Sequence, residues 1–178
     1  MFFRKMEEEI LRQELLSGFI FKDKASEKIL DELTQMAAAI CDTPISLISL
    51  VGKEKQWFQS KIGLDLDETP IENSFCRHAI EKPGEIFIVE NPLEDIRFKT
   101  NPLVQSDPNI RFYAGAPLTT SDGITLGTLC VIDKKQRALS KLQIKALQIL
   151  ANQTIDYLEH KREHVNQNDL LKKSISKF

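Results

Sequence analysis

The residues of this chain that are best suited to chemistry stand together at Cys76, Arg77 and His78. A thiol beside cationic side chains can have a lowered pKa, and the thiolate is the nucleophilic form of cysteine. Side chains two positions apart on a helix point in nearly opposite directions, so this spacing alone does not pair Cys76 with His78. We therefore expect a buried, structural Cys76 and a His78 that forms hydrogen bonds across neighbouring segments, and we predict no catalytic residue.

The other two cysteines, Cys41 and Cys130, lie far from Cys76 in the sequence. Three cysteines without a Cys-x-x-Cys pair indicate neither a disulfide framework nor a metal site. Cys130 lies in an apolar segment and is expected to be an inert core residue, whereas Cys41 ends a predicted helix and is expected to be partly exposed. This cysteine content is typical of a reduced, cytoplasmic protein.

A polar pair, Asp95 and Arg97, lies in a long irregular segment. An aspartate in such a segment most often accepts backbone N–H groups and fixes a turn, whereas an arginine can bind a carboxylate or a phosphate. We favour the scaffolding role for the pair, with anion binding by Arg97 as the alternative.

Composition narrows the class of protein further. The chain has 178 residues, and 24 Lys and Arg against 26 Asp and Glu give a net charge of −2. This length suits one domain with its own core. The balanced charge disfavours binding to nucleic acid or to an anionic membrane surface, and no apolar segment reaches the roughly 20 residues of a membrane span. We expect neither a nucleic acid nor a membrane as partner.

The elements that must position these residues follow from hydrophobic periodicity and from turn residues. Apolar residues at helical spacing and N-capping serines predict four helices, over residues 1–16, 26–41, 75–81 and from 140 onward, the last with a pattern that thins beyond His160. Apolar and β-branched runs predict strands over residues 45–51, 56–62, 86–89, 111–118 and 126–133. Residues 90–110 have no regular periodicity, and such a long loop in a compact domain is usually a lid or a binding loop. This order of elements indicates an α+β domain with an antiparallel sheet.

Several segments, taken in this order and spacing, resemble the GAF domain family of small-molecule sensors, which is related to PAS domains. The resemblance spans about residues 24–160 and is carried by Gln56-Trp57-Phe58, Glu72 to Ile80, Asp95-Ile96-Arg97-Phe98 with Asn101 to Val104, Ile110 to Leu118, and Gly127 to Asp133. It implies a sheet of five or six strands, with the N- and C-terminal helices on one face. On the other face it implies a short helix and a long loop that roof a pocket.

The resemblance also implies where a ligand would bind. The candidate wall and binding residues under the roof are Trp57, Phe58, Phe75, Cys76, His78, Asp95, Arg97, Phe98, Phe112, Tyr113 and Ala116. Because side chains alternate along a strand, Phe112 and Tyr113 cannot both face one pocket. The sequence names neither a cofactor nor the ligand, which is expected to be a small molecule.

The expected function is a non-catalytic sensory or regulatory domain in signal transduction that binds a small ligand or a signalling protein. One alternative is a free methionine sulfoxide reductase that uses Cys76, because some GAF proteins have that activity; another is a dimerisation module without a ligand. We expect residues 1–22 to form an N-terminal amphipathic helix, residues 23–160 the GAF domain, and residues 161–178 a polar helical extension. The chain is expected to be either a stand-alone bacterial-type sensor or a fragment of a larger signalling protein, and the initial Met and polar tail favour the former. We expect a homodimer formed through the terminal helices, including Phe3 to Leu15.

Overall fold

The central element of the fold is one antiparallel sheet of six strands, in the order β3-β2-β1-β6-β5-β4. The computed structural model describes the backbone of residues 2–175 and the side chains of residues 6–175. The strands are β1 (Ile45–Val51), β2 (Lys55–Ile62), β3 (Glu68–Pro70), β4 (Phe87–Val89), β5 (Phe112–Thr119) and β6 (Thr125–Asp133). The predicted α+β class and antiparallel sheet are thus confirmed.

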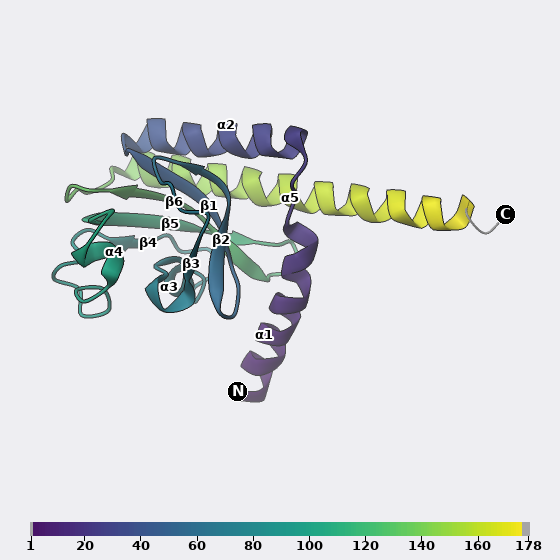
Figure 1. Ribbon diagram of the computed structural model, residues 1–178, viewed down its shortest axis with the longest axis horizontal. Helices are drawn as coiled ribbons and strands as arrows, with labels where there is room; N and C mark the ends of the chain where they lie inside the picture. Colours follow the sequence, from purple (N-terminus) through teal and green to yellow (C-terminus); the bar gives the residue numbers. More distant parts are fainter. Residues whose placement is uncertain (1, 176–178) are drawn as a thin grey trace.

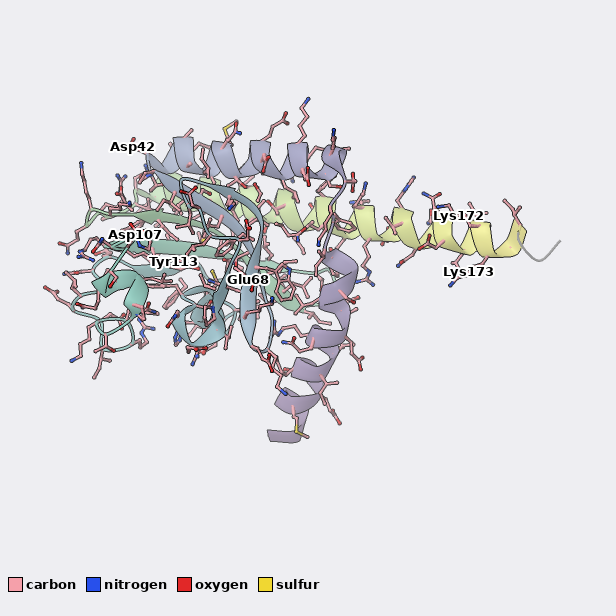
Figure 2. The ribbon with its side chains drawn as sticks, viewed as in Figure 1. Asp42, Glu68, Asp107, Tyr113, Lys172 and Lys173 are labelled. Atoms are coloured by element: carbon pink, nitrogen blue, oxygen red, sulfur yellow. The ribbon has the colours of Figure 1, made fainter. Side chains whose placement is uncertain are left out.

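Two long helices, α2 (Lys24–Cys41) and α5 (Lys141–Ile175), lie side by side across one face of the sheet (Figure 1). The Asp23 carboxylate caps α2 by accepting a hydrogen bond from the Ser26 N–H at 3.1 Å. The Tyr157 hydroxyl, on α5, lies 3.1 Å from the Ser26 hydroxyl and links the two helices. Beyond the domain, α5 continues as a single projecting helix that carries Lys172 and Lys173 (Figure 2).

The first helix, α1 (Phe2–Leu16), turns away from α2 and runs past the end of the sheet (Figure 1). Its C-terminal end is anchored by the buried side chain of Leu16 and, in the following 3-10 turn η1 (Ser17–Phe19), by that of Phe19. The Arg12 guanidinium donates a hydrogen bond to the Val51 carbonyl at the end of β1. The side chain of Phe3, which the sequence places on the apolar face of this helix, lies outside the described residues.

The opposite face of the sheet is covered by short elements, which we call the roof: η2 (Ile71–Asn73), α3 (Cys76–Ala79), the loop over residues 90–101 and α4 (Pro102–Gln105). The predicted long loop therefore contains one helical turn, which the Asn101 side chain caps by accepting from the Leu103 N–H at 2.9 Å. The strand β3 was not predicted from the sequence. It is three residues long, polar and ends in proline, which suits only the edge of a sheet.

Alternation along the central strands divides the interior into two cores. On β5, Phe112 packs in the core between the sheet and the helices, whereas the next residue, Tyr113, packs in the core between the sheet and the roof. The helix-side core includes Leu30, Ile48, Leu129 and Leu147, and the roof-side core includes Leu47, Phe75, Phe98 and Cys130. The two layers thus share the backbone of the same strands.

Candidate functional site under the roof

The space between the sheet and the roof is filled mainly by aromatic side chains. The rings of Phe75 and Phe98 stack with centroids 4.0 Å apart and planes 6° apart, and the Phe75 and Tyr113 centroids are 5.1 Å apart. All three side chains are buried. Figure 2 shows Tyr113 in the interior, between the strands and the roof. His78 lies edge-on to Phe98, with centroids 5.1 Å apart, and closes this aromatic cluster on one side.

A small cavity of about 20 Å³ remains beside this cluster. Because a single water needs roughly 10–15 Å³ on this measure, the cavity holds about one water-sized molecule. Its walls are mostly apolar, and they comprise Ile45, Leu47, Gln56, Phe58, Leu64, Leu66, Thr69, Phe75, Cys76, Leu103, Pro108, Ile110, Tyr113 and Ile132. The expectation of a ligand-sized pocket under the roof is wrong for this structure, since large side chains occupy that space.

Three of the predicted wall residues do not face the roof at all. Phe112 and Ala116 share the face of β5 opposite to Tyr113, and both belong to the helix-side core. Trp57 also packs against the helix-side core, whereas its neighbour on β2, Phe58, packs on the roof side. The physical reason is that side chains alternate along a strand. Neighbouring residues face opposite sides of the sheet, and residues two positions apart share a side.

Asp95 and Arg97 are directed at each other rather than at the cavity. The Arg97 guanidinium forms an ion pair with the Asp95 carboxylate at 2.5 Å, and the Asp95 carboxylate also accepts the Arg97 N–H at 2.9 Å. These hydrogen bonds lower the pKa of Asp95. The guanidinium also lies 4.9 Å from the centroid of the Phe87 ring and so covers the outside of the aromatic cluster. This geometry corresponds to the scaffolding role expected from the sequence.

The polar part of the site converges on the sulfur of Cys76. The Tyr113 hydroxyl lies 3.3 Å and the Thr128 hydroxyl 3.2 Å from Cys76 Sγ, and both donate hydrogen bonds to it. Cys130 lies two residues from Thr128 on the same face of β6 and packs in the same roof-side core as Cys76. Burial opposes ionisation of Cys76, but these donors outweigh burial and lower the pKa of its thiol below the ordinary range. The pKa of Cys130 is raised, first of all by its own burial.

The partners of Cys76 therefore come from the sheet and not from its own helix. His78 does not bond to the thiol; its Nδ1 lies 3.8 Å from the Glu81 carboxylate, and burial lowers the pKa of its imidazole. No hydrogen bond from His78 across the roof is found among the described residues. Cys130 is fully buried, as expected, but Cys41 is fully buried as well, which corrects its expected exposure.

A buried polar network lies next to Cys76 and was not anticipated from the sequence. The Gln56 side-chain oxygen accepts hydrogen bonds from Ser74 at 2.6 Å and from Ser49 at 3.1 Å. The Gln56 amide donates to the Thr69 hydroxyl at 2.7 Å. Ser49, Gln56 and Thr128 lie in predicted strands, where a polar side chain is the only sequence signal, whereas Ser74 was an N-capping serine and Thr69 gave no signal. Because every member is bonded, the network joins the end of η2 to β1, β2 and β3.

The comparisons with known proteins agree with this architecture. The family model described as "GAF domain" matches residues 26–155. The chain belongs to the GAF domain family. A cyclic di-GMP phosphodiesterase from Pseudomonas aeruginosa is 43% identical over 131 residues, which are 74% of this chain and 22% of that protein. The chain thus spans about a fifth of the length of that curated relative.

Solved GAF structures share the fold at low sequence identity. The GAF domain of an Acinetobacter phosphoenolpyruvate-protein phosphotransferase has a TM-score of 0.63 and 16% identity, covering 89% of this chain and 97% of that one. A type II free methionine-R-sulfoxide reductase from Thermoplasma acidophilum has a TM-score of 0.63 and 14% identity, covering 77% and 94%. At such identities the likeness concerns the fold alone. Membership of the GAF domain family rests on the family model over residues 26–155.

Over residues 2–175, no helix is both long enough and apolar enough to cross a membrane. Within the same range, no cluster of three or more histidine, cysteine, aspartate or glutamate side chains could hold a metal ion.

Proposed function

We propose that this GAF domain is a non-catalytic regulatory module in signal transduction that acts as a homodimer through its helix layer. The proposal rests on the family, on the filled interior under the roof and on an apolar surface that the helices leave exposed. The similarity to part of a cyclic di-GMP phosphodiesterase supports regulation of an enzyme of that kind, in the same chain or in a partner.

The exposed apolar surface lies on the outer side of α2. Ile29, Leu33, Met36 and Ile40 follow a spacing of four, three and four residues, so they lie along one stripe of the helix. The side chains of Ile29, Met36 and Ile40 are 38%, 52% and 36% exposed. We call these four residues the α2 stripe. Apolar stripes of this kind on a surface helix mark an interaction site.

Helix α5 extends the same surface. The Gln143 amide donates to the Ile40 carbonyl at 3.0 Å, which places the start of α5 beside the end of the α2 stripe. On α5, Leu142 is 77% and Ile149 is 50% exposed. A second copy that packed its own α2 and α5 against this surface would bury all of these side chains in a bundle of four helices.

The projecting part of α5 supports the same arrangement. Val165, Leu170, Leu171 and Ile175 are exposed on it. A single helical segment of about 15 residues is marginal in water, so pairing with a second copy would stabilise it. On α1, Met6 and Ile10 are also 46% and 52% exposed, but α1 turns away from α2, so they lie outside the surface formed by α2 and the start of α5. Paired helices that leave the domain can pass a change in packing to an attached or bound output protein.

The single observation that carries the proposal is the α2 stripe, and substitution of its most exposed member tests it. Met36→Glu should convert a dimer into a monomer, because it would place a charge in an apolar contact. Ile96→Glu is the matched control, since Ile96 is 81% exposed and belongs to the loop of the roof, which covers the face of the sheet opposite to α2. Light scattering at micromolar concentrations should give a dimer mass for the wild type and the control and a monomer mass for Met36→Glu.

A monomer mass for the wild type at every concentration would refute the dimer, as would a Met36→Glu variant with an unchanged dimer mass. The enzymatic alternative, reduction of free methionine sulfoxide by Cys76, has the size of the cavity against it, because about 20 Å³ cannot hold an amino acid. We therefore expect no turnover of free methionine sulfoxide with a thiol reductant, and measurable turnover that is lost in Cys76→Ser would contradict the non-catalytic role.

A further inference from the structure

Two thiols meet under the roof, one from the roof and one from the sheet. Cys76 opens α3, Cys130 lies in the middle of β6, and both pack in the same roof-side core. Thr128, whose hydroxyl is 3.2 Å from Cys76 Sγ, shares a face of β6 with Cys130. Gly115, over which the Tyr113 hydroxyl lies, is the cross-strand partner of Cys130, so the Cys130 side chain is next to the Cys76 sulfur. The third thiol, Cys41, lies in the other core, where burial raises its pKa to about 11. The chain thus contains one buried pair of thiols and one isolated thiol that can serve as an internal control.

The Cys76 sulfur has the surroundings that oxidation requires. Tyr113 and Thr128 donate hydrogen bonds to it at 3.3 and 3.2 Å, and these donors stabilise negative charge on the sulfur. Gly115 makes the Tyr113 contact possible, because a Cβ at that position would lie 2.2 Å from the Tyr113 hydroxyl oxygen. Cys76 also lines the small cavity, whereas Cys130 does not, so a solute in the cavity meets Cys76 first.

The size of the cavity selects the solute. About 20 Å³ admits a molecule such as hydrogen peroxide, which is slightly larger than water, and excludes organic hydroperoxides with bulky substituents. We propose that Cys76 and Cys130 form a redox site that hydrogen peroxide converts from a dithiol into a disulfide. The oxidation itself requires only the residues of this domain. The inference rests on the proposed regulatory function only where it assigns the oxidation a role in signalling.

The reaction has two steps that balance. The Cys76 thiolate attacks one peroxide oxygen, the O–O bond breaks, and the hydroxide that leaves takes up the thiol proton as water, which gives a sulfenic acid. The Cys130 sulfur then attacks the Cys76 sulfur, the S–O bond breaks, and hydroxide leaves with the Cys130 proton as a second water. In total, one peroxide is reduced by two electrons and two thiols become one disulfide.

The disulfide would have a defined structural effect. Cys76 belongs to the roof and Cys130 to a central strand, so the new bond would tie α3 covalently to β6. It would also convert the Cys76 sulfur, which now accepts hydrogen bonds from Tyr113 and Thr128, from a thiol into a disulfide sulfur. Oxidation would therefore change the packing of the roof on the sheet, and a thiol reductant would restore it.

The test uses the full chain and reads the disulfide directly. The reduced protein is treated with a small molar excess of hydrogen peroxide, alkylated and analysed by intact mass and peptide mapping. We expect the loss of two hydrogen atoms on oxidation, a cross-linked pair of Cys76 and Cys130 peptides, a Cys41 that is alkylated as a free thiol, and reversal by dithiothreitol. The same excess of cumene hydroperoxide should react at least about tenfold more slowly, because it cannot enter the cavity.

Variants separate the steps and guard against loss of folding. Cys130→Ser should stop the reaction at a sulfenic acid on Cys76, which dimedone traps when the oxidised protein is unfolded in its presence, and Cys41→Ser should oxidise like the wild type. Thr128→Val keeps the shape of the side chain and removes one donor to the sulfur, so oxidation of Cys76 should slow by about tenfold or more. Near-UV circular dichroism of each reduced variant shows that it is folded.

Three results would overturn the proposal: no cross-linked Cys76–Cys130 peptide in the folded wild type, oxidation of Cys41 at the same rate, or equal rates with the two peroxides. None of these results bears on the dimer, whose test is the mass in solution. Conversely, a monomeric protein that still forms the disulfide would refute the proposed dimer and leave the redox site standing.

Discussion

The packing of Phe75 on Phe98 predicts a large and specific loss of stability when either ring is removed. Phe75 is 3% and Phe98 is 1% exposed, and their rings stack at 4.0 Å. Truncation of a buried phenylalanine to alanine costs about 3–5 kcal/mol, part of which comes from the cavity left behind. We expect this loss in the free energy of unfolding for Phe75→Ala and for Phe98→Ala. Ile96→Ala, in the same loop as Phe98 but 81% exposed, should change it by less than about 0.5 kcal/mol.

A double-mutant cycle isolates the ring contact itself. The losses for Phe75→Ala and Phe98→Ala should not add, and their coupling should be about 0.5–1.5 kcal/mol, the size expected for an aromatic pair. Urea denaturation monitored by circular dichroism measures all four proteins of the cycle. Because a domain of this kind has about 5–15 kcal/mol of total stability, Phe75→Leu serves as a milder substitute if the double variant does not fold.

The same truncation should also create the pocket that the wild type lacks. Removal of the Phe75 ring would enlarge the existing cavity of about 20 Å³, and an apolar cavity of sufficient size binds small apolar molecules. We therefore expect benzene to raise the melting temperature of Phe75→Ala and not that of the wild type. Additive losses, losses below about 1 kcal/mol, or stabilisation of the wild type by benzene would show that this interior is not filled as described.

Three other predictions concern individual contacts. Cys76→Ala leaves the hydroxyls of Tyr113 and Thr128 without their acceptor and should lower the free energy of unfolding by about 1–3 kcal/mol. Cys76→Ser should lower it less. Equal losses for the two variants in urea denaturation would contradict this role of the sulfur. Gly115→Ala should lower the free energy of unfolding by about 1–3 kcal/mol, because the added Cβ would clash with the Tyr113 hydroxyl. The loss should be smaller in a Tyr113→Phe background, and an unchanged loss there would exclude the clash as its cause. Hydrogen bonds from Ser26, with a contribution from Lys161, lower the pKa of Asp23 from 3.8 to about 2, so the stability that these bonds provide is complete above pH 3.8 and is lost as the pH falls toward 2. Asp23→Asn should show a weaker pH dependence of thermal stability in this window, and identical profiles would refute the assignment.

Local patterns were sufficient to predict most elements of the fold. Apolar and β-branched runs defined the strands, and apolar residues at helical spacing defined α2 and α5, because these signals lie within one segment of the chain. The alternation of side chains along a strand correctly required Phe112 and Tyr113 to face opposite sides of the sheet. It did not show which of the two faces the roof, since that depends on how the strand is paired in the sheet.

The site was harder to predict because its contacts join distant segments. The sulfur of Cys76 accepts hydrogen bonds from hydroxyls that are 37 and 52 residues away in the sequence. Among its sequence neighbours, only Arg77 and His78 were candidate partners. The size of the cavity under the roof could not be predicted either, because it depends on how Phe75, Phe98 and Tyr113 pack together. The same aromatic residues could line an open pocket or fill it, and the sequence does not distinguish the two.

The central strands give the roof and the helix layer a common mechanical support. Tyr113 places its hydroxyl on the Cys76 sulfur, while its neighbour Phe112 packs in the core that includes Leu147 and Ala151 of α5. On β6, the Thr128 hydroxyl lies on the same sulfur, Cys130 packs with Cys76 in the roof-side core, and Leu129 between them packs in the helix-side core. Closely packed interiors transmit displacements rather than absorb them. A covalent bond between Cys76 and Cys130 would therefore shift β5 and β6, the two strands on which α5 packs. We propose that the domain acts through α5.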